Sequence, residues 1–266
     1  MTEAVTAPPW GRTFALAMGE IARFRVGPWT LRVQRHAHEW RARWETDDDP
    51  LSMAVGFTCP AGEASLDEEG TVNRYALQDA PGTFALVPRV ADRAVVVRPA
   101  RSFTLLPGGS ADVYVSTSLW VAMELGPGGP LLFDVPVTRP SDTWFGPDTR
   151  EGELCYASRT SARLELAELP LRPGRAVTRI HLDNRGQKAV QLERVHLPAP
   201  ELQVYVDPRG HVWTEPVHVS LDADGEGQVR YGSGPPRHAP DAHPVGTPRR
   251  KAERALFARA LSALWT

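Results

Sequence analysis

The chain has 266 residues, with 30 basic and 32 acidic side chains and a formal net charge of −2. This length allows one large all-β domain or two sandwiches of ordinary size, so a stable fold requires neither a metal nor a disulfide. The balanced charge excludes a global field that would attract nucleic acid or anionic lipid, and no nucleic-acid partner is expected.

The cysteine content and the absence of targeting signals point to the cytoplasm. Cys59 and Cys155 lie far apart in the sequence, and residues 1–30 contain no charged-then-apolar signal segment. No apolar run approaches the ~18–20 residues that span a bilayer. We therefore expect a cytoplasmic protein with two free, buried thiols, and a disulfide between them is the alternative.

Proline and glycine, at 25 and 22 residues, interrupt the sequence at short intervals. The β-branched and aromatic runs between them predict strands and turns. Residues 24–26 and 29–33 predict a hairpin joined by a Gly-Pro turn, and residues 40–44 alternate like a half-buried antiparallel strand. Further strands are predicted at residues 83–87, 94–98, 102–106, 111–125, 131–137, 153–166, 176–182, 189–197, 202–206, 211–221 and 228–231.

A recurring proline-glycine corner suggests a two-part architecture. Leu-Pro-Gly-Gly at 106–109 and Leu-Arg-Pro-Gly at 171–174 each precede a predicted strand. An internal duplication would explain these two similar segments. Sandwiches also use such corners widely without duplication, and both explanations stay open. We expect an all-β chain of two β-sandwich-like halves, residues 1–138 and 139–232.

The C-terminal region departs from the strand pattern. Residues 233–247, rich in Pro, Gly and Ser, predict a flexible linker. Residues 248–266 predict an amphipathic helix, with Thr247 as its cap and Pro248 in its first turn. The apolar stripe needs a partner, and basic residues crowd the first turns, where the helix dipole disfavours cations. The residues predicted to contact that partner are Leu256, Phe257, Leu261, Leu264, Trp265, Arg250 and Arg254.

Three kinds of surface fit such a stripe. A protein partner or a second copy of the chain is the expected partner in intermolecular binding. A membrane surface is a weaker alternative, since the apolar stripe and the basic turns also suit anionic lipid. Docking on the chain's own sandwich is the intramolecular alternative.

No histidine pair completes a metal motif, so no metal ligand and no cofactor is expected. His36 and His38 have the i, i+2 spacing that places two imidazoles on one strand face, as in cupin metal sites. Glu39 follows immediately and Glu45 is too distant for the usual spacing. A polar hairpin turn explains the two histidines, and a metal-dependent enzyme at His36 and His38 is an alternative.

Acidic residues near the start of the second half offer a hydrolase interpretation. A carboxylate pair for glycoside chemistry can be chosen from Asp142, Asp148, Glu151 and Glu153, but the sequence does not fix their separation. No Ser or Cys lies in a nucleophile elbow, and there is no glycine-rich phosphate loop. An acidic-residue hydrolase or a carbohydrate-active sandwich is therefore an alternative, with no catalytic residue assigned.

The eight tryptophans suggest either sugar-stacking surfaces or core residues. Trp144 lies beside Gly146 and Pro147 and is predicted to be a buried structural corner. The tryptophans that fall inside strand patterns, where core burial is the commoner fate, are Trp29, Trp40, Trp44, Trp120 and Trp213.

Several motifs resemble one family in the same order along the chain. The clearest are Thr-Trp-Phe-Gly-Pro at 143–147 and Gly-Glu-Leu-Cys-Tyr at 152–156, and similar segments lie at 24–28, 97–108 and 202–206. The chain resembles an archaeal and bacterial family known only as domain of unknown function number four hundred and thirty-two, over roughly residues 10–232. This resemblance implies a fold-level grouping and assigns no catalytic residue.

Sandwiches without polar catalytic clusters commonly act by binding. The expected function is therefore a non-enzymatic binding or interaction module that acts through sheet edges, loops and the C-terminal helix.

Overall fold

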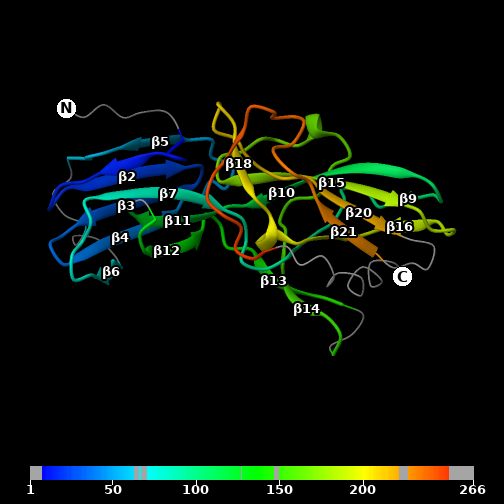
Figure 1. The fold of residues 1–266 in the computed structure, drawn as a ribbon, viewed down its shortest axis with the longest axis horizontal. Helices are drawn as coiled ribbons and strands as arrows, with labels where there is room; N and C mark the ends of the chain where they lie inside the picture. Colours follow the sequence, from blue (N-terminus) through cyan, green and yellow to red (C-terminus); the bar gives the residue numbers. More distant parts are fainter. Residues whose placement is uncertain are drawn as a thin grey trace. The chain divides into compact units, whose positions relative to one another are not determined.

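The computed structural model describes residues 8–62, 66, 71–126, 128–146, 150–221 and 227–251 (Figure 1). Over these residues the protein is all-β, as predicted, with two three-residue 3-10 helices as its only helical elements. None of the helices in the described ranges is long and apolar enough to cross a membrane. Of the predicted C-terminal helix, residues 248–251 are described and are not helical, and the remainder, beyond Lys251, lies outside the described residues.

The described chain divides into two compact units, and neither is continuous in sequence. Unit 1 contains described residues within 1–89, 119–138 and 172–174, and unit 2 those within 90–118, 139–171 and 175–251. The predicted boundary at residue 139 coincides with one passage of the chain between the units. Residues 90–118, which precede that boundary, belong to unit 2.

Unit 1 is built from two antiparallel sheets of orders β5-β2-β3-β4-β6 and β1-β7-β11-β12. The predicted hairpin at residues 24–33 is confirmed: Gly27 turns the chain with φ +59°, a left-handed conformation that favours glycine. The strands are β1 (Thr13–Ala15), β2 (Ile21–Val26), β3 (Trp29–Arg35), β4 (Glu39–Thr46), β5 (Val55–Thr58), β6 (Asn73–Ala76), β7 (Thr83–Arg89), β11 (Trp120–Leu125) and β12 (Leu131–Pro136).

Aromatic side chains fill the interior of unit 1. Phe14 packs edge-on against Phe24 with ring centroids 4.9 Å apart, and Trp40 packs against Phe84 at 5.3 Å. Alternating side chains on strands point to opposite faces, so these rings come from the inward face of each strand. Core burial is confirmed for four of the five strand tryptophans, namely Trp29, Trp40, Trp120 and Trp213. The fifth, Trp44, is half-buried.

Unit 2 is organised around β15, a ten-residue strand. It pairs antiparallel with β10 and parallel with β19 and β20 within a seven-stranded sheet. A four-stranded sheet, β13-β14-β8-β17, and a two-stranded one, β16-β9, complete the unit. The elements are β8 (Val95–Val97), β9 (Phe103–Leu105), β10 (Ser110–Ser118), β13 (Ser141–Phe145), β14 (Glu153–Ala157), η1 (Leu166–Glu168), β15 (Arg175–Asn184), β16 (Val190–Leu192), β17 (Val195–Leu197), η2 (Ala199–Glu201), β18 (Val204–Val206), β19 (Val212–Thr214), β20 (Val217–Leu221), β21 (Gly227–Tyr231) and β22 (His243–Pro244).

Some predicted strands have different bounds in the structure. The run predicted at 111–125 is two strands, β10 and β11, which separate at Leu119 and enter different units. The strand predicted at 153–166 ends at Ala157, and the chain continues through bends into η1. Strand β13, just after the predicted boundary between the halves, was not predicted, and four of its five residues are exposed or half-buried.

The segment 233–247, predicted to be a flexible linker, is packed within unit 2. Ala239 and Ala242 are buried against Tyr205 and Trp213, and β22 pairs with β18. Small residues fit closely against the flat faces of aromatic rings, so low hydrophobicity did not prevent packing here. The linker interpretation is therefore corrected: this part of the chain belongs to the core of unit 2.

Candidate functional site

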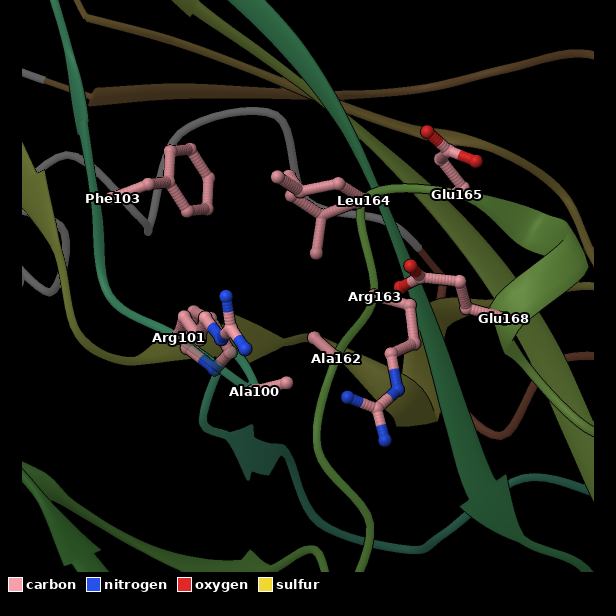
Figure 2. Close-up of a pocket in the computed structure, with 10 residues that line it drawn as sticks. Ala100, Arg101, Phe103, Ala162, Arg163, Leu164, Glu165 and Glu168 are labelled. Carbon is pink, nitrogen blue, oxygen red and sulfur yellow. The ribbon is translucent and has the colours of Figure 1, made fainter.

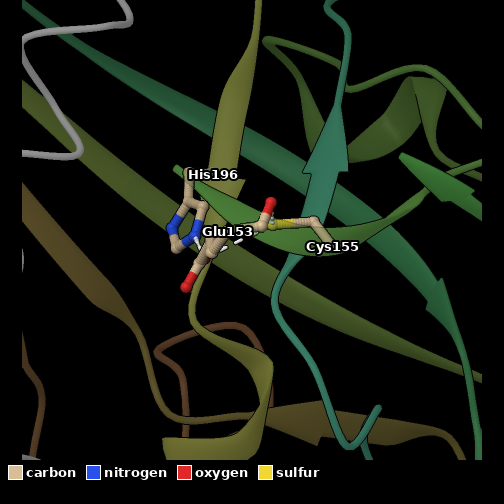
Figure 3. A group of neighbouring side chains, drawn as sticks. All are labelled: Glu153, Cys155 and His196. Carbon is tan, nitrogen blue, oxygen red and sulfur yellow. Dashed lines mark hydrogen bonds and ion pairs between the residues drawn. The ribbon is translucent and has the colours of Figure 1, made fainter. Parts of the chain in front are cut away.

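A cluster of three side chains with metal-ligand or catalytic chemistry lies on the four-stranded sheet of unit 2. Glu153 and Cys155 are two residues apart on β14 and point to the same face. In the register of the sheet, His196 on β17 lies opposite Val96 of β8, which lies opposite Ala157 of β14. Residues that pair across strands share a face, so His196 projects on the same side as the other two (Figure 3).

The turn before β14 requires two glycines. A Cβ at Gly146 would lie 2.1 Å from the carbonyl oxygen of Glu151, and one at Gly152 would lie 2.7 Å from Trp144 Nε1. Both distances are shorter than real contacts allow. The glycines of this motif therefore permit the close approach of β13 and β14 that places Glu153.

The three side chains contact one another directly. The Glu153 carboxylate bonds to His196 Nε2 and accepts a hydrogen bond from the Cys155 thiol at 3.3 Å, both through Oε1. Cys155 and His196 are buried, and the ring of Phe145 packs on His196 with centroids 4.9 Å apart. The Glu153 side chain is 46% exposed, so the cluster opens to solvent on the glutamate side.

The electrostatics of the cluster disfavour a cysteine nucleophile. Burial, and then the adjacent Glu153 carboxylate, raise the pKa of the Cys155 thiol far above its ordinary value. The hydrogen bond from His196 lowers the pKa of Glu153, which keeps that carboxylate ionised. A reactive cysteine needs a thiolate beside a cation, whereas here an anion lies between the thiol and the imidazole.

Of the acidic residues considered from the sequence, only Glu153 enters the cluster. Asp142 pairs with Arg93 at 3.2 Å, and Asp148 lies outside the described residues. His196 was not singled out from the sequence. Its signal was a histidine between two apolar residues in a short strand, a position where an imidazole is buried and therefore needs a polar partner.

His36 and His38 lie in the polar turn between β3 and β4. The His36 amide donates to the Glu39 carbonyl at 2.8 Å, and His38 Nδ1 bonds to the Gln78 carbonyl at 2.9 Å. Within the described ranges, neither histidine belongs to a group of three potential metal ligands. Both cysteines are free, as predicted, with Cys155 buried and Cys59 half-buried.

The expectation of a buried Trp144 is wrong, because its side chain is 42% exposed. Trp144 and Phe145 are neighbours on β13 and point to opposite faces of the sheet. Phe145, which is buried beside His196, occupies the inward position.

A cavity of about 390 Å³ lies elsewhere in unit 2. Segment 99–103 forms one side, and segment 162–168 forms the other (Figure 2). The side chains of Phe103 and Leu164 lie along one wall, and the guanidinium groups of Arg101 and Arg163 lie across from them (Figure 2). Neither guanidinium bonds or pairs with any residue that the structure describes.

The predicted partner-binding residues are described only at Arg250. Its amide donates to the Pro200 carbonyl at 3.0 Å, and the neighbouring Arg249 side chain donates to the Val90 carbonyl at 2.8 Å. The predicted contact residues that lie outside the described ranges are Arg254, Leu256, Phe257, Leu261, Leu264 and Trp265.

The fold and these two sites define an all-β chain with a polar cluster and a cavity in one unit. The chain belongs to the family described as "Protein of unknown function (DUF432)", whose model matches residues 9–264. This match confirms the resemblance and extends it, because it runs past residue 232 through the C-terminal segment that the resemblance had left out. No curated protein and no solved structure matches the chain.

Proposed function

We propose that this chain is a non-enzymatic binding module whose cavity in unit 2 takes a small amphipathic anion. The observation that carries the proposal is the pair of guanidinium groups, from Arg101 and Arg163, that have no partner among the described residues. Guanidinium groups bind carboxylate and phosphate through parallel hydrogen bonds. An anionic ligand would supply the acceptors that the described chain does not.

The shape and lining of the cavity support a ligand with an apolar part. A volume of about 390 Å³ falls within the range of small-molecule sites. Phe103 and Leu164 offer apolar surface across from the arginines (Figure 2). Glu165 and Glu168 lie at the η1 end of the lining and would repel a second negative charge, which favours a ligand with one anionic end.

Binding rather than hydrolysis is also favoured by the carboxylates. In the described chain, Asp142 pairs with Arg93 and Glu153 with His196, so each of these two carboxylates contacts a basic side chain. Three earlier expectations also form part of the proposal. The sheets of each unit pack face to face as in a sandwich, and the protein acts in the cytoplasm. The C-terminal segment binds a protein partner or a second copy of the chain.

The test uses 1-naphthyl phosphate, an aromatic phosphate monoester, with full-length protein. We expect saturable binding by calorimetry that weakens with salt, and at least about tenfold weaker binding in Arg101→Gln and Arg163→Gln. Arg159→Gln is the matched control, because Arg159 is exposed and lies outside the cavity lining. Equal binding of neutral 1-naphthol, or equal losses in all three variants, would overturn the proposal.

A further inference from the structure

We infer that Glu153, Cys155 and His196 form a binding site for a divalent transition-metal ion of the Zn²⁺ type. One ligand atom from each residue lies within 4.8 Å of the others, and the structure thus brings together oxygen, sulfur and nitrogen donors. Zn²⁺ binds this set of donors at about 2.0–2.3 Å, which separates tetrahedral ligand atoms by roughly 3.3–3.8 Å. Small side-chain adjustments bring the three ligand atoms from their present positions to the separations of a tetrahedral site.

The backbone holds the donors on one face of a single sheet. Glu153 and Cys155 come from β14, and His196 comes from β17, with β8 between these two strands in the sheet. Ligands carried by paired strands are fixed more firmly than ligands on loops. Phe145 packs on the imidazole and limits its rotation, as outer-shell contacts do in metal sites.

Hydrogen bonding alone gives no reason for a cysteine at this position. A thiol is a weak donor, and a serine hydroxyl would serve the Glu153 carboxylate better. Sulfur is, by contrast, a preferred ligand of Zn²⁺ and of other thiophilic metals. When the ion binds, the Cys155 thiol releases its proton to solvent and Sγ coordinates as thiolate. The proton that His196 Nε2 donates to Glu153 moves to Nδ1 or to solvent, so that the Nε2 lone pair and the Glu153 carboxylate are free to coordinate the ion.

The open side of the cluster gives the ion access. Cys155 and His196 are buried, whereas the half-exposed Glu153 side chain forms the boundary with solvent. Three protein ligands leave a fourth tetrahedral position for water. The arrangement therefore leaves one coordination position open, since closed structural sites use four protein ligands.

Cobalt(II) provides the decisive probe, because a cobalt–thiolate bond produces a near-ultraviolet charge-transfer band. Full-length protein is stripped with chelator and titrated with Co²⁺. We expect the band to saturate at one equivalent and to disappear when Zn²⁺ is added. Cys59→Ser is the matched control and should retain the band, while Cys155→Ser and His196→Gln should lose it. Loss of a direct ligand should weaken Zn²⁺ binding by at least about 100-fold, since outer-shell changes alone cost 10–100-fold.

A second measurement avoids variants of the buried site, which could disturb the fold. In the Cys59→Ser protein, Cys155 is the only thiol, and Zn²⁺ should slow its alkylation at least about tenfold. Absence of a cobalt band in the parent protein, a band that depends on Cys59, or alkylation unaffected by Zn²⁺ would each overturn the inference. The result is independent of the cavity, because no residue of the cluster lines it.

Discussion

The two units use their interiors in different ways. The core of unit 1 is built from aromatic and aliphatic side chains, such as the stacked Phe14 and Phe84. Among the described residues, seven polar or charged side chains are buried, and only Gln34 belongs to unit 1. The six in unit 2 are Ser116, Thr117, Thr178, Asn184, His196 and Thr214.

The two kinds of interior contribute differently to the fold: apolar burial mainly stabilises it, and buried polar groups mainly specify one arrangement of neighbouring residues. An apolar core is stabilised by burial and packing, and it tolerates rearrangement of its members. A buried polar group is costly unless each of its hydrogen bonds is made, so it fixes its neighbours in one arrangement. Thr178 and Thr214 illustrate this in unit 2, where their buried hydroxyls bond at 2.8 Å. Both candidate sites lie in the unit with the polar interior.

The largest effect is expected for a core residue of unit 1. Trp40 is fully buried against Phe84, and Trp40→Ala should lower the free energy of unfolding by about 3–5 kcal/mol. Trp144→Ala removes the same side chain from a 42% exposed position in unit 2 and should cost less than half as much. Chemical denaturation of the two variants measures this difference. Equal losses would contradict the assignment of Trp40 as core and Trp144 as surface.

A smaller loss is expected for a buried polar residue of unit 2. Asn184 donates through Nδ2 to the carbonyls of Leu105 and Lys188, at 2.9 and 2.8 Å, and its Oδ1 accepts from the Gly186 amide. Asn184→Leu keeps the size but removes all three bonds and leaves the buried Leu105 carbonyl without this donor, which should cost about 2–3 kcal/mol.

The neighbouring Arg185→Ala is the control for Asn184→Leu. Arg185 is exposed and pairs only with Asp183 in the described chain, so its loss should cost less than about 1 kcal/mol. Denaturant midpoints compare the two variants. An Asn184→Leu protein as stable as the parent would show that the polar interior of unit 2 is not a source of stability.

The sequence predicted the pairing of the β2–β3 hairpin in unit 1 better than the pairing around β15 in unit 2, for a topological reason. Strand positions were missed in both units, at β1, β5 and β6 in unit 1 and at β13 and β22 in unit 2. Antiparallel hairpins such as β2–β3 join neighbouring segments, and their alternation and Gly27 turn are local signals. In unit 2, β15 pairs in parallel with β19 and β20, across long connections. The three- to five-residue apolar strands involved carry no sign of their partner or direction.

The candidate site could be predicted only in part. Glu153 and Cys155 lie within one motif and their i, i+2 spacing already places them on one face. His196 joins them through β8, forty residues or more from its partners, and no periodicity records that pairing. The cavity likewise combines segments 99–103 and 162–168, and no local pattern in the sequence records that these segments meet.

The smallest effect on stability is expected from removing residues 252–266. The described chain of unit 2 is anchored before this point, by Arg249 to Val90 and by the Arg250 amide to Pro200. Truncation after Lys251 should therefore shift the melting temperature by less than about 3 °C, which for a chain of this size is within about 1 kcal/mol. Under the proposed role of the segment in binding a second copy or a protein partner, truncation should abolish self-association in sedimentation experiments.

A full-length variant separates the apolar stripe from the length of the segment. Leu261→Asp with Leu264→Asp changes two positions of the predicted stripe, and it should reproduce the loss of association with unchanged melting. A fall of more than about 5 °C in melting temperature with association intact would instead mean that the segment docks on its own chain. The variant could instead retain self-association and lose only its binding to anionic vesicles. That result would mean that the segment binds a membrane surface and not a protein, because the basic residues before the stripe suit anionic lipid as well as an acidic protein.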